Sequence, residues 1–265
     1  LVAGSVEEAQ DRYAAVDEMT RLLDSNYDRA SFRNRLGYKQ DLMGRPPPFA
    51  GQNGFALEPL LALARSRVLE GDEILQVSDM LDCMEDVALW REGLEKHGEF
   101  LYLPAIASDI QVNATLQDLL HNAFEDKDGV GRRLSGSTFP PIGRLRARVR
   151  SLKAEVLGTL ETLLPSIQSK LNLESGGALY SEVNGGRLVV PVDPKHASSI
   201  GIVHDTSRSG KTVYVEPREI IGTTNELRQA EGDLKAEEAR VWRLLTEQIL
   251  LNRVPLERAV YAIGE

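Results

Sequence analysis

Two long series of regularly spaced apolar residues most restrict the folds that this chain of 265 residues can adopt. The first series recurs at steps of three or four, which is the spacing of one face of an α-helix. Its members are Ile142, Leu145, Val149, Leu152, Val156, Leu160, Leu163, Ile167 and Leu171. At 1.5 Å per residue, the pattern predicts a single helix about 45 Å long.

The second series lies farther along the chain and repeats at intervals of seven. It consists of Ile220, Leu227, Leu234 and Val241, and it is continued by Leu245 and Ile249. The first apolar stripe is narrow, which suits contact with one partner helix better than burial on all sides, and the second series is the candidate partner. We therefore expect the two helices to pair as an antiparallel arm.

The segment between the two series, Gly177–Pro217, is the only part of the sequence with β character. The runs ALYSEV and RLVVPV flank Asn184–Gly186, which is a strong signal for a hairpin turn. The runs IGIVHDT and KTVYVEP flank Ser207–Gly210 and predict a second hairpin.

The run DTSRSGKT, Asp205–Thr212, ends in Gly-Lys-Thr as phosphate-binding loops do. The loop pattern needs a glycine where this chain has Asp205, and it needs a helix after the lysine. Here the lysine is followed by a β-branched and aromatic run that stops at Pro217. The run therefore predicts a tight turn, with Arg208 and Lys211 at or beside its tip.

Helical patterns dominate the residues before the arm. They cover about 5–24, 57–71, 72–98 and 104–124, whereas about 27–54 resembles a loop or insertion because GRPPPFAGQNG cannot form a helix. The single cysteine, Cys83, fits a small buried group in one of these helices. No apolar run is long enough to span a membrane.

The charge is unevenly distributed along the chain. The whole chain carries −9, and residues 1–130 hold 12 Lys and Arg against 24 Asp and Glu. Residues 131–218 hold 13 against 7, so positive charge is concentrated in the first arm helix and the β segment. This asymmetry points to an anionic partner for the middle of the chain.

Arginine suits phosphate because its planar fork donates two parallel hydrogen bonds. The predicted phosphate contacts are Arg187, Lys195, Arg208 and Lys211 in the β segment and Arg144, Arg148 and Arg150 on the arm. The alternative is a solvated helix whose arginines pair with the acidic N-terminal helices. His204 and Glu216 favour a cross-strand polar pair over a metal or acid–base site, and the sequence offers no catalytic residue.

The sequence resembles the core, lever and clamp of MutS-type proteins, and within them the second subfamily, which is linked to suppression of recombination. The resemblance is carried by the motifs R-x-V-V-P-V at Arg187–Val192, G-I-V-H-D-x-S-x-S-G-x-T at Gly201–Thr212, V-E-P at Val215–Pro217 and N-x-L at Asn225–Leu227. None of the six phenylalanines is followed by Glu two residues later, so the Phe-x-Glu motif of mismatch-recognising relatives is absent.

The resemblance implies a mainly α fold, in which a helical core continues into a long antiparallel two-helix lever that carries a small antiparallel β clamp. The expected parts are a core at residues 1–140, an ascending lever helix at 141–174, a clamp at 175–218, and a descending lever helix with the return to the core at 219–265. It further implies a fragment of a homodimeric ATPase that clasps branched or duplex DNA and suppresses homologous recombination. Many members carry a C-terminal endonuclease domain.

The sequence is also compatible with two alternatives: a factor of the same family that binds rRNA and splits collided ribosomes, and a non-catalytic helical scaffold. We expect no cofactor in this fragment, whereas ATP and Mg are implied for an ATPase domain beyond Glu265. We expect no membrane partner, and the compartment is the bacterial cytoplasm or a plastid.

Overall fold

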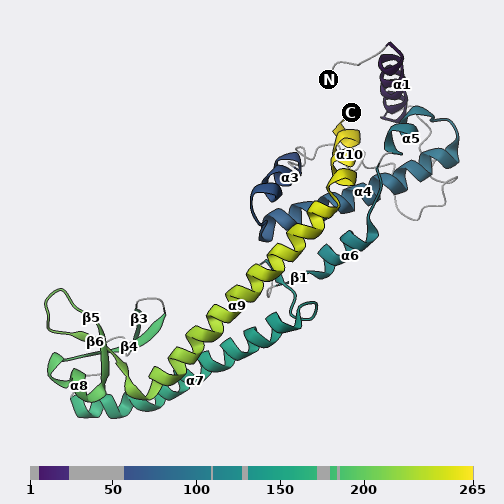
Figure 1. Cartoon of the computed structure of the whole chain (residues 1–265). Helices are drawn as coiled ribbons and strands as arrows, with labels where there is room; N and C mark the ends of the chain where they lie inside the picture. The colour runs from purple at the N-terminus through teal and green to yellow at the C-terminus, as the bar shows by residue number, and fades with distance from the viewer. Residues whose placement is uncertain are drawn as a thin grey trace. The chain divides into compact units, whose positions relative to one another are not determined.

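The computed structural model describes residues 6–23, 57–108, 110–126, 131–171, 180–183 and 186–264. These residues form a mainly α-helical protein with a small antiparallel sheet, which confirms the predicted fold class (Figure 1). The chain divides into two compact units, one built from residues 1–133 and 240–265 and the other from Leu134–Ala239. The insertion predicted at residues 27–54 lies outside the described residues.

The first unit is helical. It contains the helices α1 (Val6–Leu23), α3 (Leu57–Ser66), α4 (Gly71–His97), α5 (Tyr102–Ala107), α6 (Ala114–Asn122) and α10 (Arg253–Gly264), and also the end of α9 (Arg218–Leu251) from Arg240 onward. Along α4 the fully buried residues Ile74, Val77, Leu81 and Met84 recur at helical spacing and form one side of the core. Cys83 is buried in the same helix, as the sequence predicted, and burial raises the pKa of its thiol.

A carboxylate on α1 holds the start of α5. Glu18 is 3% exposed and accepts hydrogen bonds from the backbone N–H groups of Leu101, Tyr102 and Leu103, at 2.7, 3.0 and 2.9 Å. The first N–H groups of a helix have no partner within the helix, and a carboxylate satisfies them and favours the helix dipole. This contact ties two helices that are 79 residues apart, counted from Leu23 to Tyr102.

The prediction of one helix over residues 104–124 is wrong. The structure has α5 and α6 there, and Asn113 begins the second helix by accepting a hydrogen bond from Leu116 N at 3.0 Å. Phe124 begins a strand, β1 (Phe124–Asp126), which pairs with β2 (Arg132–Leu134). This strand pair was not expected, because the sequence indicated β structure only between the two arm helices.

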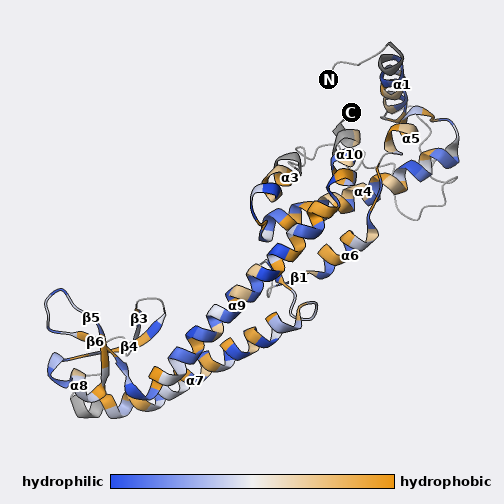
Figure 2. Ribbon diagram, in the orientation of Figure 1, coloured by the Kyte–Doolittle hydropathy of each residue, from blue (hydrophilic) through white to orange (hydrophobic). Residues whose placement is uncertain are grey.

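The arm predicted from the two apolar series is formed by α7 (Pro140–Leu171) and α9 (Arg218–Leu251). Arg146 pairs with Glu238 at 3.0 Å and Lys153 pairs with Glu231 at 2.9 Å. Residues with higher numbers on α7 therefore contact residues with lower numbers on α9. The helices are therefore antiparallel, as expected. Between them Leu152, Leu227 and Ala230 are buried, and Figure 2 shows apolar and polar residues alternating along both helices.

The residues between the arm helices form both predicted hairpins, which join into one four-stranded antiparallel sheet. Its strands are β3 (Ser181–Val183), β4 (Arg187–Val192), β5 (Gly201–Thr206) and β6 (Val213–Pro217), and their order is β3-β4-β6-β5. Val190 and Val192 of β4 and Val213 and Val215 of β6 share one buried cluster with Leu160 of α7. The sheet is thus anchored on the C-terminal half of α7. Asn184 and Gly185 of the first predicted turn lie outside the described residues.

The strand β5 is preceded by an irregular connection and contains a bulge. A short 3₁₀ turn, η1 (Pro194–His196), and the helix α8 (Ala197–Ile200) connect β4 to β5, and both were unexpected. The register shifts by one residue between Val203 and Asp205, which is a β-bulge. At the start of the strand, a Cβ on Gly201 would lie 1.8 Å from the carbonyl oxygen of Glu216, so only glycine allows this approach.

Candidate nucleic-acid interface

The run DTSRSGKT ends β5 with its first two residues and forms the turn to β6 with the other six. Ser207 N donates to Thr212 O at 2.8 Å, Gly210 N donates to Ser207 O at 2.8 Å, and Ser207 Oγ accepts from Thr212 N at 3.1 Å. Gly210 has a φ of +67°, in the left-handed region that favours glycine. A strand follows the turn, where a phosphate loop would need a helix, so these residues do not fit a nucleotide phosphate.

Three predicted phosphate contacts lie at one end of the sheet. Val192 pairs with Val213 and Thr206 also pairs with Val213, so the residues just after β4, after β5 and before β6 gather at this end. We call Lys195, Arg208 and Lys211 the tip cations. All three side chains are exposed, and within the part of the chain that the structure describes they have no ion-pair partner.

Arg187 occupies the other end of the same sheet and has partners. Its Nη1 donates to both carboxylate oxygens of Glu216, at 3.0 and 2.8 Å, and its Nη2 donates to Asn225 Oδ1 at 3.0 Å. Glu216 is fully buried and also lies 2.7 Å from His204 Nε2. This confirms the cross-strand pair predicted for His204 and Glu216. The carboxylate joins β4, β5 and β6, and the guanidinium of Arg187 extends the network to Asn225 of α9.

This network links motifs that are far apart in the sequence. Arg187, His204, Glu216 and Asn225 each come from a different one of the four motifs quoted above, and the structure brings all four into one set of hydrogen bonds. The sequence marked these residues only as motif members. Their contacts depend on strand register and on the bulge in β5, which no local pattern reveals.

The three lever cations, Arg144, Arg148 and Arg150, are exposed on α7. Arg148 lies 3.8 Å from Glu226 with both side chains more than half exposed, which is a weak surface pair. Arg144 and Arg150 make no ion pair with another described residue. The structure does not bring the lever cations together with the tip cations.

Two other basic residues of α7 hold the arm together. Arg146, whose side chain is 15% exposed, donates to Glu238 at 3.0 Å and to the carbonyl of Leu134 at 2.5 Å, and Lys153 pairs with Glu231. The sequence left open a pairing of the arginines with the acidic N-terminal helices. The acidic partners of Arg146 and Lys153 lie on α9 instead, so part of the positive charge of α7 is neutralised within the arm.

None of the helices in the described part of the chain combines the length and the apolar character needed to cross a bilayer. Within the same residues, no group of three or more His, Cys, Asp or Glu side chains is placed to hold a metal ion.

Several curated proteins are similar to this chain. An endonuclease MutS2 of Synechocystis sp. is 28% identical over 201 residues, which are 76% of this chain and 23% of that protein. An endonuclease MutS2 of Pelotomaculum thermopropionicum is 27% identical over 224 residues, 83% of this chain and 27% of that protein. A MutS2 protein of Bacillus subtilis is 30% identical over 239 residues, 89% of this chain and 28% of that protein.

The chain therefore spans about a quarter of the length of these relatives. No protein-family model matches it.

Proposed function

Because the chain belongs to a MutS2-related family, we propose that it is the core, lever and clamp part of a MutS-type ATPase that clasps DNA. In this proposal the arm of α7 and α9 is the lever and the four-stranded sheet is the clamp. The partner is branched or duplex DNA, held between the clamps of two copies of the protein, and the outcome is suppression of homologous recombination. No catalytic residue is proposed within these 265 residues, and no step of the proposal runs through ATP.

The observation that carries the proposal is the state of the tip cations. Arg208 and Lys211 are exposed on a hydrogen-bonded turn between two strands, and no described carboxylate neutralises either of them. Because neither cation has an intramolecular partner among the described residues to give up, both are available to phosphate, and binding releases counterions from the nucleic acid. Such contacts position the backbone and carry no base information.

The seven predicted contacts differ in how available they are for this role. The tip cations together with Arg144 and Arg150 are exposed without an ion pair among the described residues, so they are proposed as direct phosphate contacts. Arg148 can exchange its weak pair with Glu226 for a phosphate. Arg187 is proposed to act mainly by holding β4 to α9, because its guanidinium already donates to Glu216 and Asn225.

The test compares binding of a four-way DNA junction to the unchanged chain and to the double variant Arg208→Glu with Lys211→Glu. Fluorescence anisotropy is measured between 50 and 200 mM salt. We expect the variant to lose at least about tenfold in affinity at 100 mM salt, and its plot of log affinity against log salt to be shallower by about 2, since each lost phosphate contact removes about one unit of slope.

The matched control is Lys96→Glu with Arg243→Glu, which changes the net charge equally at exposed positions of the first unit. An equal loss in the control would reduce the effect to general electrostatics and contradict the proposal. Binding to purified ribosomes is measured in parallel. If the tip variant weakens ribosome binding while junction binding is absent or unchanged, the ribosomal alternative replaces the DNA proposal.

A further inference from the structure

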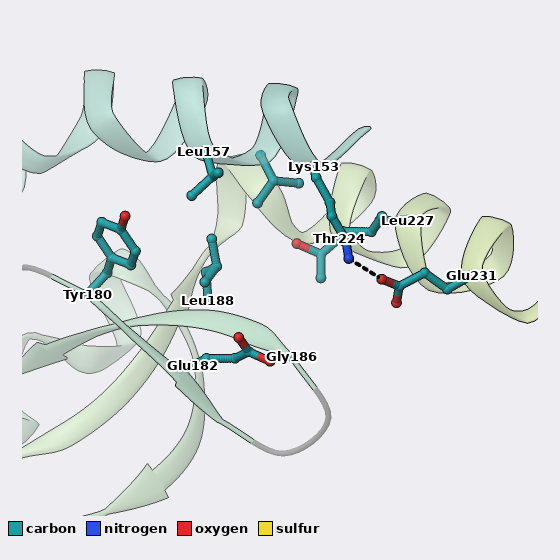
Figure 3. A pocket seen from close by; sticks show the side chains of 10 residues that line it. Lys153, Leu157, Tyr180, Glu182, Gly186, Leu188, Thr224, Leu227 and Glu231 are labelled. Atoms are coloured by element: carbon teal, nitrogen blue, oxygen red, sulfur yellow. Dashed lines mark ion pairs between the residues drawn. The ribbon is translucent and has the colours of Figure 1, made fainter. Parts of the chain in front are cut away.

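A pocket of about 400 Å³ opens between the arm and the β3–β4 hairpin, all within the unit Leu134–Ala239. Val156 and Leu157 of α7, Leu227 of α9 and Leu188 of β4 give it apolar walls, and Tyr180 closes one side (Figure 3). Tyr180 and Leu157 are each 37% exposed, so both remain accessible to a ligand. Walls of this kind suit a flat, largely apolar group.

One polar atom in the pocket has no partner. Thr224 is 1% exposed, and its Oγ1 forms no hydrogen bond with any described residue. Threonine in a helix commonly bonds the carbonyl four residues earlier, as Thr162 does here with Gly158 at 2.8 Å. The hydroxyl of Thr224 points into the space between α7 and the hairpin (Figure 3), where a ligand could supply the missing bond.

The charged residues of the lining favour a hydrogen-bond donor over a phosphate. Lys153 is already paired with Glu231 at 2.9 Å, and Glu182 adds a second carboxylate on the hairpin side. Arg228 also lies beside Gly186 and 3.9 Å from Glu231, so two cations balance the two carboxylates around the pocket, which suits a neutral ligand better than an anion. A carboxylate accepts hydrogen bonds from exocyclic amino groups such as N4 of cytosine or N6 of adenine.

The pocket is also next to a lever cation. Arg150 precedes Lys153 by three residues on α7, a spacing that places two side chains on neighbouring positions of the helix surface. A nucleic-acid strand whose phosphates lie on Arg150 would have a base within reach of the pocket. Bases that are not stacked in a duplex are commonly held against aromatic side chains and read along their polar edges.

We propose that this pocket holds an unpaired nucleobase that carries an exocyclic amino group. Tyr180 and the leucines cover the faces of the base, the Glu182 carboxylate accepts from its amino group, and the Thr224 hydroxyl bonds its edge. This proposal rests on the proposed function, because it gives the DNA-clasping part a means to prefer branched over fully paired DNA. The same chemistry would admit a free nucleoside.

The test uses the full chain and a DNA duplex with one unpaired 2-aminopurine, which fluoresces less when it is stacked. We expect quenching on binding and tighter binding than to the same duplex fully paired or carrying an unpaired thymine. Tyr180→Ala should abolish the quenching and reduce the preference roughly tenfold. Thr224→Val has nearly the same shape and should reduce the preference about fivefold while the fold is retained.

The control is Tyr13→Ala, since Tyr13 is 78% exposed on α1 in the other unit and should leave the preference intact. Free adenosine is titrated in parallel by NMR, with the Tyr180 ring signals as the readout. If DNA binding depends on Arg208 and Lys211 but shows no preference for an unpaired base, and adenosine does not perturb Tyr180, the pocket proposal is overturned and the proposed function stands. If the chain binds no DNA but adenosine perturbs Tyr180, the proposed function fails and the pocket is a nucleoside site.

Discussion

Glu216 is constrained through its side chain and its main chain at the same time. Its carboxylate accepts from Arg187 and meets His204, and its carbonyl oxygen faces Gly201 at a distance that admits no Cβ. A buried carboxylate is tolerated when its lone pairs are occupied by charged donors, and breaking such a set leaves an uncompensated charge. The clamp thus depends on a few side chains at the end where α9 begins.

Substitution of Gly201 tests this constraint. Gly201→Ala should lower the free energy of unfolding by more than about 2 kcal/mol, because the new methyl group has to displace backbone atoms of β6. The measurement is urea unfolding followed by circular dichroism.

The matched control is Gly232→Ala on α9, where a Cβ would meet no atom within 4 Å. In a helix interior this change should stabilise by about 1 kcal/mol, since alanine has the higher helix propensity. If both variants had the same stability, the close approach at Gly201 would not constrain the clamp.

At the scale of the element, the start of α4 shows how a helix end is fixed by charge. Glu70 and Glu73 form a reciprocal capping box, and Arg67 makes a bidentate pair with Glu73. The hydrogen bonds from Arg67 lower the pKa of Glu73 below its ordinary value of 4.5. The guanidinium and the helix N-terminus both favour the ionised carboxylate.

The pH dependence of stability follows from that shift. A carboxyl group with a depressed pKa in the folded state contributes stability that is present above its ordinary pKa and is lost as the pH falls through the depressed value. Glu73→Gln should therefore destabilise the protein at pH 7 and have a progressively smaller effect below about pH 4.5. Urea unfolding at a series of pH values measures this difference.

Asp72→Asn serves as the control, because it removes an exposed charge from the same turn. A destabilisation by Glu73→Gln that stays constant down to pH 2.5 would rule out the ion pair as the cause.

Periodicity predicted the long elements because α7 and α9 each bury one narrow stripe against a single partner. The hairpins followed from turn residues, and Arg208 and Lys211 from their place in one of those turns. The break between α5 and α6 was not predicted, because the apolar residues on both sides of Asn113 fit one helical pattern. Only the capping role of Asn113 indicates that a new helix begins there. The pocket beside Thr224 could not be predicted, since its walls come from both arm helices and the hairpin.

Each of the two units of the molecule has a hydrophobic core of its own. The cluster around Leu160, Val190 and Val215 lies within Leu134–Ala239, whereas the buried residues of α4 lie in the other unit. The free energy of local unfolding is expected to differ between the two units, because opening one unit breaks only the contacts within that unit. The positive charge of the middle of the chain is thus carried by a unit with its own source of stability.

A core substitution should therefore have a confined effect. Leu160→Ala removes a fully buried side chain and should destabilise the second unit by about 3 kcal/mol. Hydrogen exchange measured by mass spectrometry should show faster exchange in β4 and β6 and unchanged protection in α4.

The control is Leu157→Ala, three residues earlier on the same helix and 37% exposed, which should cost less than about 1 kcal/mol. Equal loss of protection in α4 would mean that the two units open together.

The bulge in β5 has a consequence for how this region can diverge among related proteins. Because successive side chains alternate between the faces of a sheet, removing the extra residue would rotate Gly201 and Ile202 to the faces they now avoid. Exchange of one side chain for another at Ile202 or Val203 should be accepted readily, since both are about half exposed. An insertion or deletion between Ile200 and Val213 should not be accepted, because the number of residues in this segment determines which side chain of β5 reaches Glu216.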